Sequence, residues 1–357
     1  MTEMHKAVVI LDGYFDIDYK YKRKIVDEFD GVTLKDFADF SYEFLSKTHK
    51  KVNKAEFSSY FTEEVYKSLI NYYDKEGITV LTESLDEYPF EFRSIDYAPV
   101  CLYLKGNLSL LKNLNKISIV GSRKTLQSVL KITEEYAKRL SKANVVIVTG
   151  VADGGDLSAI KGALESKNII CILAGGFNCS SKEFSREYIN KVEKRGLLLT
   201  EHSPKVITKP FHYPIRNRLI AGLSKGTLIV SGNIKSGTRY TYDYALQYGK
   251  DVFAFPYGLG VASGEICNEI IKNGGYLVTD LKDITEVLGF DIESEKIVKL
   301  SNNENIVLTA IKNGKYTVDD IIEETSLKVF EILPILTSLE IKNLIVKNGS
   351  AYSSIKN

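Results

Sequence analysis

The sequence of 357 residues has no tryptophan, and it holds only four cysteines, four histidines and seven prolines. The cysteines form no CxxC pair and have no histidine at metal-ligand spacing, which argues against a disulfide framework or a zinc site. No run approaches 18 apolar residues, and no N-terminal signal pattern is present. We therefore expect a cytoplasmic protein that makes no membrane contact.

The signatures of several enzyme classes are missing as well. No GxGxxG motif follows the first predicted strand, which disfavours a nicotinamide or flavin enzyme. The order of Lys235-Ser236-Gly237-Thr238 is wrong for a P-loop. With few histidines and no nucleophile elbow, a hydrolase triad has little support. We expect a protein that is not an enzyme and that needs no cofactor.

The formal net charge of +1 hides an uneven distribution along the chain. Residues 1–100 hold 13 basic and 20 acidic side chains, a net charge of −7, so the remainder has a net charge of +8. Within residues 201–250, eight basic side chains stand against two acidic ones. A solvated surface explains such a run as readily as a nucleic-acid site does, so the charge alone leaves both interpretations open.

The pattern of apolar residues predicts three folded parts. Residues 1–85 have apolar side chains at helical spacing, which predicts a helical domain. Residues 86–290 alternate short apolar runs with amphipathic helices, which is typical of βαβ units and a parallel sheet. A polar linker over residues 291–303 precedes residues 304–357, where three helices and a hairpin predict a winged helix. The expected fold is α/β with an extended Rossmann-like core.

Glycines, hydroxyl groups and cations follow the predicted strands of this core, where parallel sheets bind their ligands. The first such turn is Gly121-Ser122-Arg123, which we expect to lie between a strand and a helix N-terminus and to favour a phosphate. Later junctions supply Lys209 and Lys235-Ser236-Gly237. Tight turns explain part of the glycines, but they do not explain the accompanying cations.

Two arginines follow Tyr213-Pro214, where the proline predicts the first residue of a helix. Arg216 and Arg218 would then lie near the helix N-terminus, where each opposes the helix dipole at a cost of about 0.3–1 kcal/mol. A bound anion would offset that cost. The alternative is an internal salt bridge, from Arg218 to Asp156 or Glu201, and the sequence leaves both open.

The motifs of the core also occur in the order known from one protein family. The motifs before the middle of the core are Tyr-Pro at 88–89, Lys-Gly at 105–106, Val-Gly-Ser-Arg at 120–123 and the glycine-rich segment 149–156. The later motifs are Gly-Leu-Leu-Leu-Thr-Glu at 196–201, the run from Tyr-Pro-Ile-Arg to Ala-Gly-Leu-Ser at 213–224, Lys-Ser-Gly at 235–237, and the segments 252–256 and 268–274. On these residues the chain resembles the DNA-processing protein A family, also called DprA or Smf. The resemblance is strong over residues 88–280, and the flanking parts agree more loosely with the family's SAM-like and winged-helix domains.

The resemblance implies a homodimeric, non-catalytic protein that binds single-stranded DNA. Such a protein protects incoming strands during natural transformation and loads the RecA recombinase onto them. The resemblance assigns Ser122 and Arg123 to a phosphate or a flipped base, with Lys209, Tyr213 and Lys235 lining the same pocket. The expected DNA-binding residues are Gly121, Ser122, Arg123, Lys209, Tyr213, Arg216, Arg218, Lys235, Ser236 and Gly237.

The chain departs from the family pattern at three places beside this pocket. Tyr213 stands where the family usually has a phenylalanine, and this ring can still stack. Asp153 stands where the family usually has an arginine, and the run 239–242 differs from the hydroxyl and apolar residues expected after Gly237. Two other functions on the same core stay open, a nucleotide-binding sensor and an enzyme that resembles the nucleotide phosphoribohydrolases. The enzyme has the weaker basis, because residues 240–242 are Tyr-Thr-Tyr where a catalytic glutamate is expected.

Overall fold

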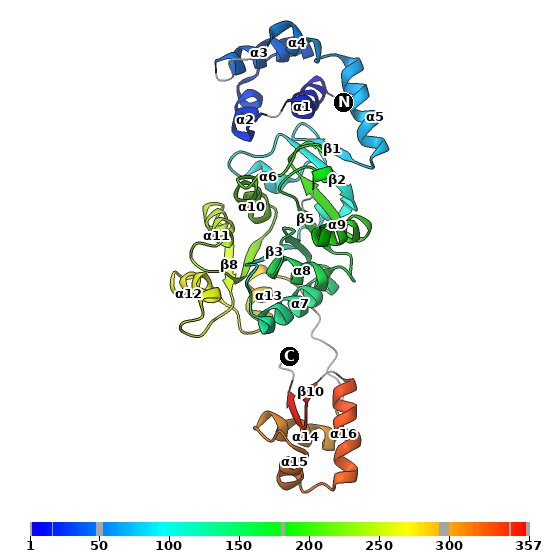
Figure 1. Cartoon of the computed structure of the whole chain (residues 1–357), viewed down its shortest axis with the longest axis vertical. Helices are drawn as coiled ribbons and strands as arrows, with labels where there is room; N and C mark the ends of the chain where they lie inside the picture. Colours follow the sequence, from blue (N-terminus) through cyan, green and yellow to red (C-terminus); the bar gives the residue numbers. More distant parts are fainter. Residues whose placement is uncertain are drawn as a thin grey trace. The chain divides into compact units, whose positions relative to one another are not determined.

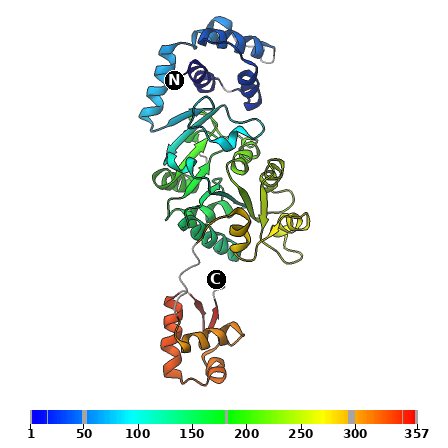
Figure 2. The ribbon, with the colours of Figure 1, turned by 180° about the vertical axis from the view of Figure 1, so that it is seen from behind.

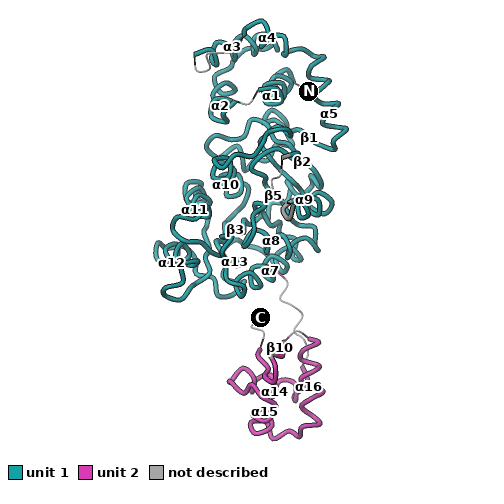
Figure 3. The backbone as a smooth tube through the Cα atoms, viewed as in Figure 1, with its two compact units in different colours: residues 1–291 teal, residues 292–357 magenta. Residues whose placement is uncertain are grey.

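The computed structural model describes residues 2–15, 17–47, 53–179, 183–292, 300–342 and 344–354. The chain divides into two compact units, residues 1–291 and 292–357, which have different colours in Figure 3. The predicted boundary between residues 85 and 86 lies inside the first unit. Most of the predicted linker lies outside the described residues.

The first unit begins with helices α1 (Glu3–Tyr14), α2 (Tyr19–Glu28), α3 (Leu34–Ser46), α4 (Lys54–Ser59) and α5 (Glu63–Lys75). Capping side chains set where these helices start. The Thr33 hydroxyl accepts a hydrogen bond from the Asp36 N–H, and the Asp36 carboxylate accepts one from the Thr33 N–H. Apolar residues of α1, α3 and α5 share a hydrophobic cluster with Val80 and Tyr103 of the sheet. Figures 1 and 2 show these helices beside the edge of the sheet formed by β1 and β2.

A nine-stranded sheet forms the middle of the first unit, in the order β1-β2-β6-β5-β4-β3-β7-β8-β9. Its strands are β1 (Thr79–Thr82), β2 (Cys101–Gly106), β3 (Lys116–Gly121), β4 (Val146–Thr149), β5 (Ile169–Ile172), β6 (Leu197–Thr200), β7 (Gly226–Ser231), β8 (Asp251–Ala254) and β9 (Tyr276–Leu277). The seven neighbouring strands β6-β5-β4-β3-β7-β8-β9 all run parallel to one another, whereas β2 pairs antiparallel with both β1 and β6. Valine, isoleucine and leucine form these strands because side chains on both faces of a covered parallel sheet are buried.

Helices cover both faces of the sheet. They are α6 (Phe90–Arg93), α7 (Gln127–Lys142), α8 (Gly155–Ala163), α9 (Glu183–Arg195), α10 (His212–Gly222), α11 (Thr238–Gln247), α12 (Glu265–Lys272) and α13 (Lys282–Leu288), with short 3-10 helices at Leu108–Lys112, Phe177–Cys179 and Ala262–Gly264. Val146 and Val148 join a cluster with α10, α11 and α12, whereas the intervening Ile147 points to the other face. The helices α7 and α8 pack closely together, and a Cβ on Gly162 would lie 2.1 Å from the Glu134 carbonyl oxygen.

The mostly parallel sheet with its connecting helices confirms the predicted α/β class. The sequence analysis missed β1, because its four residues lie next to a segment with helical periodicity. It also placed the start of α10 two residues late, since the helix begins at His212 and not at Pro214. The part of the chain that the structure describes has no helix that is long and apolar enough to span a membrane.

The second unit contains α14 (Asn302–Lys312), α15 (Val318–Thr325), α16 (Val329–Ile341) and a hairpin of β10 (Ile345–Asn348) and β11 (Ala351–Ser354). Apolar residues from all five elements form its core. The Glu304 carboxylate joins α14 to α16, because it accepts hydrogen bonds from the Ser338 hydroxyl at 2.7 Å and the Lys342 ammonium at 2.5 Å. The order of elements is the predicted one, and the winged-helix assignment stays a prediction.

Candidate functional site

The carboxyl ends of β3 and β7 meet in the middle of the sheet, at the point where the strand order reverses. From β3 the chain proceeds through β4 and β5 to β6 on one side, and from β7 it proceeds through β8 to β9 on the other side. In open α/β sheets, ligands bind in the crevice outside such a switch point. The turn at 121–123 ends β3 and the loop at 232–237 follows β7, so two of the predicted segments lie at this switch point.

The backbone of the turn after β3 is fixed by its neighbours. The Ser122 N–H donates to the carbonyl oxygen of Ser231 at 3.2 Å and to its hydroxyl at 2.9 Å. The Ser122 carbonyl oxygen accepts from the Thr125 hydroxyl at 2.6 Å and from the Gly155 N–H at 3.4 Å. These bonds attach the turn to β7 on one side and to α8 on the other, so the position of the following Arg123 is well determined.

Arg123 is exposed at this turn. The helix α7 begins only at Gln127, with Leu126 at its N-cap position. A short loop therefore separates the turn from the helix N-terminus that the sequence placed there. The charge that this turn offers to a ligand is that of the Arg123 side chain.

Three glycines allow the turns after β3 and β4 to touch. A Cβ on Gly121 would lie 2.5 Å from Val230 Cγ2, and a Cβ on Gly155 would lie 2.5 Å from Gly121 Cα. Gly154 has a φ of +90°, and a Cβ there would lie 2.1 Å from the Ser122 carbonyl oxygen. Larger residues do not fit at these positions, so the glycines hold the Ser122 turn against the start of α8.

Arg216 is buried in the structure, with 5% of its surface exposed. Its guanidinium donates a hydrogen bond to the carbonyl oxygen of Ile172 at the end of β5. The guanidinium and the Asp156 carboxylate both border Gly150, within 2.7 Å of the place that a Cβ would take. Asp156 also accepts from the Gly121 N–H at 3.2 Å. Burial raises the pKa of Asp156 to about 6, and the charge of Arg216 opposes this rise.

Arg218 forms an internal ion pair of the kind that the sequence left open. Its guanidinium donates to the Glu201 carboxylate, and the two side chains are 2% and 5% exposed. The same guanidinium lies 4.9 Å from the centre of the Tyr19 ring. Because α10 starts at His212, both arginines lie in its second turn, where the dipole argument for a bound anion is wrong.

The loop after β7 carries Lys235, which is exposed. The hydroxyl groups of Ser236 and Thr238 are hydrogen-bonded to each other at the start of α11. The Gly237 carbonyl oxygen accepts from the Asn217 amide at 3.1 Å, which ties the loop to α10. The loop is thus anchored at its far end, and Lys235 faces solvent.

Lys209 and Tyr213 lie at the start of α10. The Lys209 N–H donates to His212 Nδ1 at 3.2 Å, and the His212 N–H donates to the Lys209 carbonyl oxygen at 3.0 Å. Lys209 is exposed, with its ammonium 5.8 Å from the centre of the Phe211 ring, and Tyr213 is half-buried. One turn further, α10 reaches the end of β5 and the loop after β7, so its first turn belongs to the carboxyl edge of the sheet.

The predicted site residues therefore fall into two groups. Arg123, Lys209 and Lys235 are exposed on three connections at the carboxyl edge, whereas Arg216 and Arg218 are buried and paired inside the fold. The exposed group can contact an extended anion such as a nucleic-acid backbone. The buried group fixes the backbone that carries the exposed one.

Three polar residues hold this edge together, and the sequence analysis named only Asp156 among them, as a possible partner of Arg218. Ser231 bonds the turn after β3, Asp156 bonds the Gly121 N–H, and Asn217 bonds the loop after β7. Each had a positional signal, because Ser231 ends one strand, Asp156 follows the glycines after another, and Asn217 stands between the two arginines. That signal does not distinguish a supporting residue from a ligand-binding one.

A family model described as DNA recombination-mediator protein A matches residues 79–289. The matched segment contains all nine strands of the large sheet and the candidate site.

Curated relatives come from several bacteria. DNA processing protein DprA of Bacillus subtilis is 34% identical over 219 residues, which cover 60% of this chain and 73% of the relative. DNA processing protein DprA of Streptococcus pneumoniae is 34% identical over 200 residues, which cover 56% of this chain and 70% of the relative. Protein Smf of Escherichia coli K12 is 32% identical over 207 residues, which cover 57% and 55%.

The similar solved structures include two of DNA processing protein A. The X-ray structure of DNA processing protein A from Streptococcus pneumoniae aligns with a TM-score of 0.67 and 26% identity, covering 82% of this chain and all of that one. DNA processing protein A from Helicobacter pylori aligns with a TM-score of 0.55 and 25% identity, covering 60% and 97%. The latter structure is described as showing the single-stranded DNA binding mode of that protein.

Proposed function

Because the chain belongs to the DNA recombination-mediator protein A family, we propose that it binds single-stranded DNA along the carboxyl edge of its parallel sheet. The observation that carries this proposal is Arg123, an exposed cation at the switch point on a turn that β7 and α8 fix in place. Lys209 and Lys235 add positive charge on the connections after β6 and β7. The single-stranded DNA binding described for the Helicobacter pylori relative supports the same ligand.

The chemistry of these residues suits a strand without a fixed sequence. Arg123, Lys209 and Lys235 contact phosphates, which every strand presents in the same form. The half-buried Tyr213 stacks on a base, and such stacking contributes about 1–3 kcal/mol per base. Arg216 and Arg218 do not contact the strand themselves, but their buried contacts hold α10 in position.

A binding protein of this kind protects incoming strands during natural transformation and passes them to the RecA recombinase. We propose that this chain acts in that way in the cytoplasm, as a homodimer and without catalysis. The supporting facts are its family and the absence of a recognised catalytic motif in the sequence. RecA filament growth on a protein-coated oligonucleotide tests the loading step, and light scattering after gel filtration tests the dimer.

The DNA proposal is tested by fluorescence anisotropy of a labelled single-stranded oligonucleotide over a series of salt concentrations. We expect wild-type affinity to fall linearly with the logarithm of salt concentration, because bound cations displace counterions. Arg123→Ala should weaken binding by about tenfold or more and reduce the salt slope by about one. The matched control is Lys142→Ala, which removes an exposed cation at the far end of α7, about 24 Å along a 16-residue helix.

Two results would count against this site. If the wild-type chain does not bind the oligonucleotide, the proposed function is wrong. If Arg123→Ala and Lys142→Ala weaken binding equally, the strand follows the general charge of the surface and not the switch point.

A further inference from the structure

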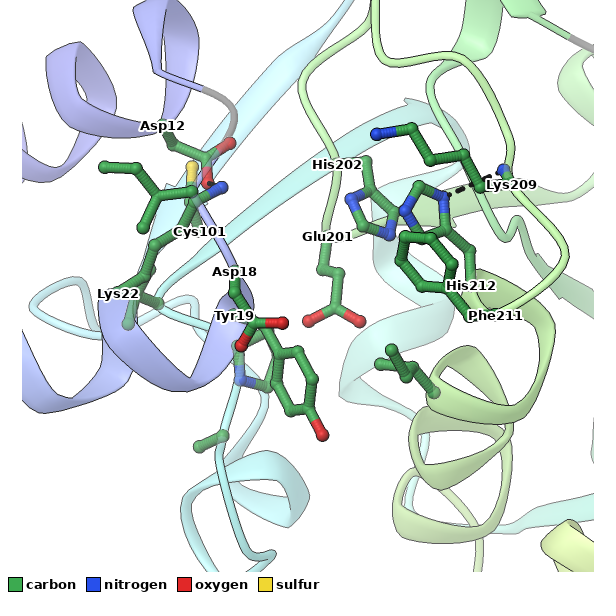
Figure 4. A pocket seen from close by; sticks show the side chains of 15 residues that line it. Asp12, Asp18, Tyr19, Lys22, Cys101, Glu201, His202, Lys209, Phe211 and His212 are labelled. Atoms are coloured by element: carbon green, nitrogen blue, oxygen red, sulfur yellow. Dashed lines mark hydrogen bonds and ion pairs between the residues drawn. The ribbon is translucent and has the colours of Figure 1, made fainter. Parts of the chain in front are cut away.

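A cavity of about 240 Å³ lies within the first unit, between the N-terminal helices and the segment that joins β6 to α10. Figure 4 shows side chains from both parts around it. Its walls include Asp18, Tyr19, Glu201, His202, Phe211 and His212. None of the described residues that line it belongs to the turns after β3 and β7. It is therefore a second candidate site away from the switch point, and it shares one residue, Lys209, with the proposed DNA-binding edge.

Glu201 offers this cavity a hydrogen-bond acceptor that the protein does not use. Its Oε2 accepts from Arg218, whereas its Oε1 is buried and has no hydrogen-bond partner among the described residues. Glu201 is 6% exposed, and Figure 4 shows its carboxylate directed into the cavity, toward Tyr19. His202 Nε2 is likewise buried and without a hydrogen bond within the described ranges. A ligand with N–H donors would satisfy an atom that is costly to leave unpaired.

The charged groups at the cavity are equal in number and opposite in sign, because the carboxylates of Asp12, Asp18 and Glu201 stand against the cations of Lys22, Lys209 and Arg218. The Asp12 carboxylate accepts from the Lys22 ammonium at 2.5 Å and from the Tyr103 hydroxyl at 2.8 Å. Glu201 is neutralised by Arg218. A strongly charged ligand would leave an unpaired charge in this space, so a neutral polar one fits better.

Aromatic rings give the cavity flat walls. Tyr19 stands on the side of α2, and Phe211 stands on the side of α10. The rings of His202 and His212 stack with centroids 4.5 Å apart and planes at 25°. Planar heterocycles pack well against such rings. The cavity therefore matches a ligand that is planar, neutral and provided with donors at its edge.

We propose that this cavity binds a free nucleoside whose base carries an exocyclic amino group, with that group donating to Glu201 Oε1. Adenine, cytosine and guanine have such a group, whereas uracil and hypoxanthine do not. This inference goes beyond the proposed function, because the ligand is a monomer and neither Arg123 nor Lys235 lines the cavity, although Lys209 does.

Isothermal titration calorimetry of the full chain tests the proposal with guanosine, inosine, cytidine and uridine as probes. Guanosine and inosine differ only by the exocyclic amino group. We expect one-to-one binding of guanosine or cytidine, and binding of the counterpart without the amino group, inosine or uridine, to be weaker by about tenfold or more. Tyr19→Ala should weaken the same binding by about tenfold, because it removes one wall of the cavity.

Two control variants complete this experiment. Tyr14→Ala removes an exposed tyrosine of α1 that does not line the cavity, and it should leave nucleoside binding unchanged. The Arg123→Ala variant should bind nucleosides as the wild type does, while its affinity for single-stranded DNA falls. Thermal melting of each variant shows whether it is folded, and Phe211→Ala replaces Tyr19→Ala if the latter is not.

The inference is overturned if none of the four nucleosides binds. It is also overturned if guanosine binds with the same affinity as inosine and cytidine binds with the same affinity as uridine. It is also overturned if Arg123→Ala abolishes nucleoside binding while both wall variants keep it, because the nucleoside would then occupy the DNA edge. The nucleoside titrations use no DNA, so this inference and the proposed function can fail independently.

Discussion

The loops of the carboxyl edge and the interior beneath them use positive charge in opposite ways. At the switch point between β3 and β7, Arg123 and Lys235 are exposed on loops. Toward β5 and β6, Arg216 and Arg218 are buried beside Asp156 and Glu201. An exposed cation is free to meet a ligand, whereas a buried one is committed to its internal partner. Burial, and not position after a strand, therefore separates the proposed binding residues from the supporting residues at this edge.

The largest effect is expected from a variant that breaks the buried ion pair between Arg218 and Glu201. Arg218→Met leaves the Glu201 carboxylate buried without its partner, and we expect the free energy of unfolding to fall by about 3–5 kcal/mol. Urea unfolding of the full chain, followed by far-ultraviolet circular dichroism, measures this change. The double variant Glu201→Gln with Arg218→Met should recover part of the loss. A single variant as stable as the wild type would show that the pair contributes nothing.

The second unit has a buried charge of the same supporting kind, and it predicts a pH dependence. Hydrogen bonds from Lys342, Ser338 and the Ser301 N–H lower the pKa of Glu304 from 4.5 to about 2. This contribution is complete above pH 4.5 and is lost as the pH falls toward 2, because the unfolded chain then binds the proton first. Glu304→Gln should lower the stability of this unit by about 1.5–3 kcal/mol at pH 7.

A fluorescence reporter can follow the second unit within the full chain, because the sequence has no tryptophan. Phe330→Trp places one on α16, where the phenylalanine is exposed. In that background, the stability of the unit should differ more between pH 7 and pH 3 with Glu304 than with Glu304→Gln, whose remaining difference comes from Asp320, because hydrogen bonds from Thr317 lower the pKa of that carboxyl too. The same pH sensitivity in both chains would assign it to another group.

The glycine contact beside Arg123 gives a smaller effect. Gly154→Ala places a Cβ against the Ser122 carbonyl oxygen at a φ of +90°, and we expect it to cost about 1–3 kcal/mol. Gly237→Ala is the matched control, because no atom lies within 4 Å of its Cβ position and its φ is −59°. Thermal unfolding should separate the two variants clearly. Equal losses would mean that the turns after β3 and β4 do not need their close contact.

The smallest predicted effect concerns the second exposed cation. Lys235→Ala should reduce the slope of DNA affinity against salt by about one, because one phosphate contact is lost. The chain should unfold at the same denaturant concentration as the wild type, since Lys235 is exposed. Anisotropy and urea unfolding on the same preparation check both statements. A stability loss without a change in slope would place Lys235 among the supporting residues.

The sheet and most of its helices could be predicted from the sequence because their signals are local. Runs such as Ile-Ile-Cys-Ile at 169–172 are short, apolar and β-branched, and helical patterns separate them. The sequence analysis did not predict β1, because four residues are too few to show a clear strand pattern. Its pairing with β2 joins residues about 20 positions apart in the sequence. Pairing between strands is a long-range property that a local pattern does not contain.

The candidate site was predictable in its residue types but not in their roles. The turn at Arg123 followed from glycine and charge after a strand, which are local features. The pair of Arg218 with Glu201 was one of two alternatives, and only the burial of both side chains decides between them. The cavity beside Tyr19 was out of reach, because it needs residues from α2 and from the end of β6 in one place.

The strand β1 has a consequence for any cut or fusion of this chain. By sequence it follows the N-terminal helices, but its backbone hydrogen bonds lie with β2 at the edge of the sheet. A truncation at residue 85 would remove it and leave the N–H and C=O groups of β2 open along one side, ready to pair with another molecule. A truncation or fusion that is meant to remove only the N-terminal helices should therefore be placed before Thr79, in the turn that follows α5.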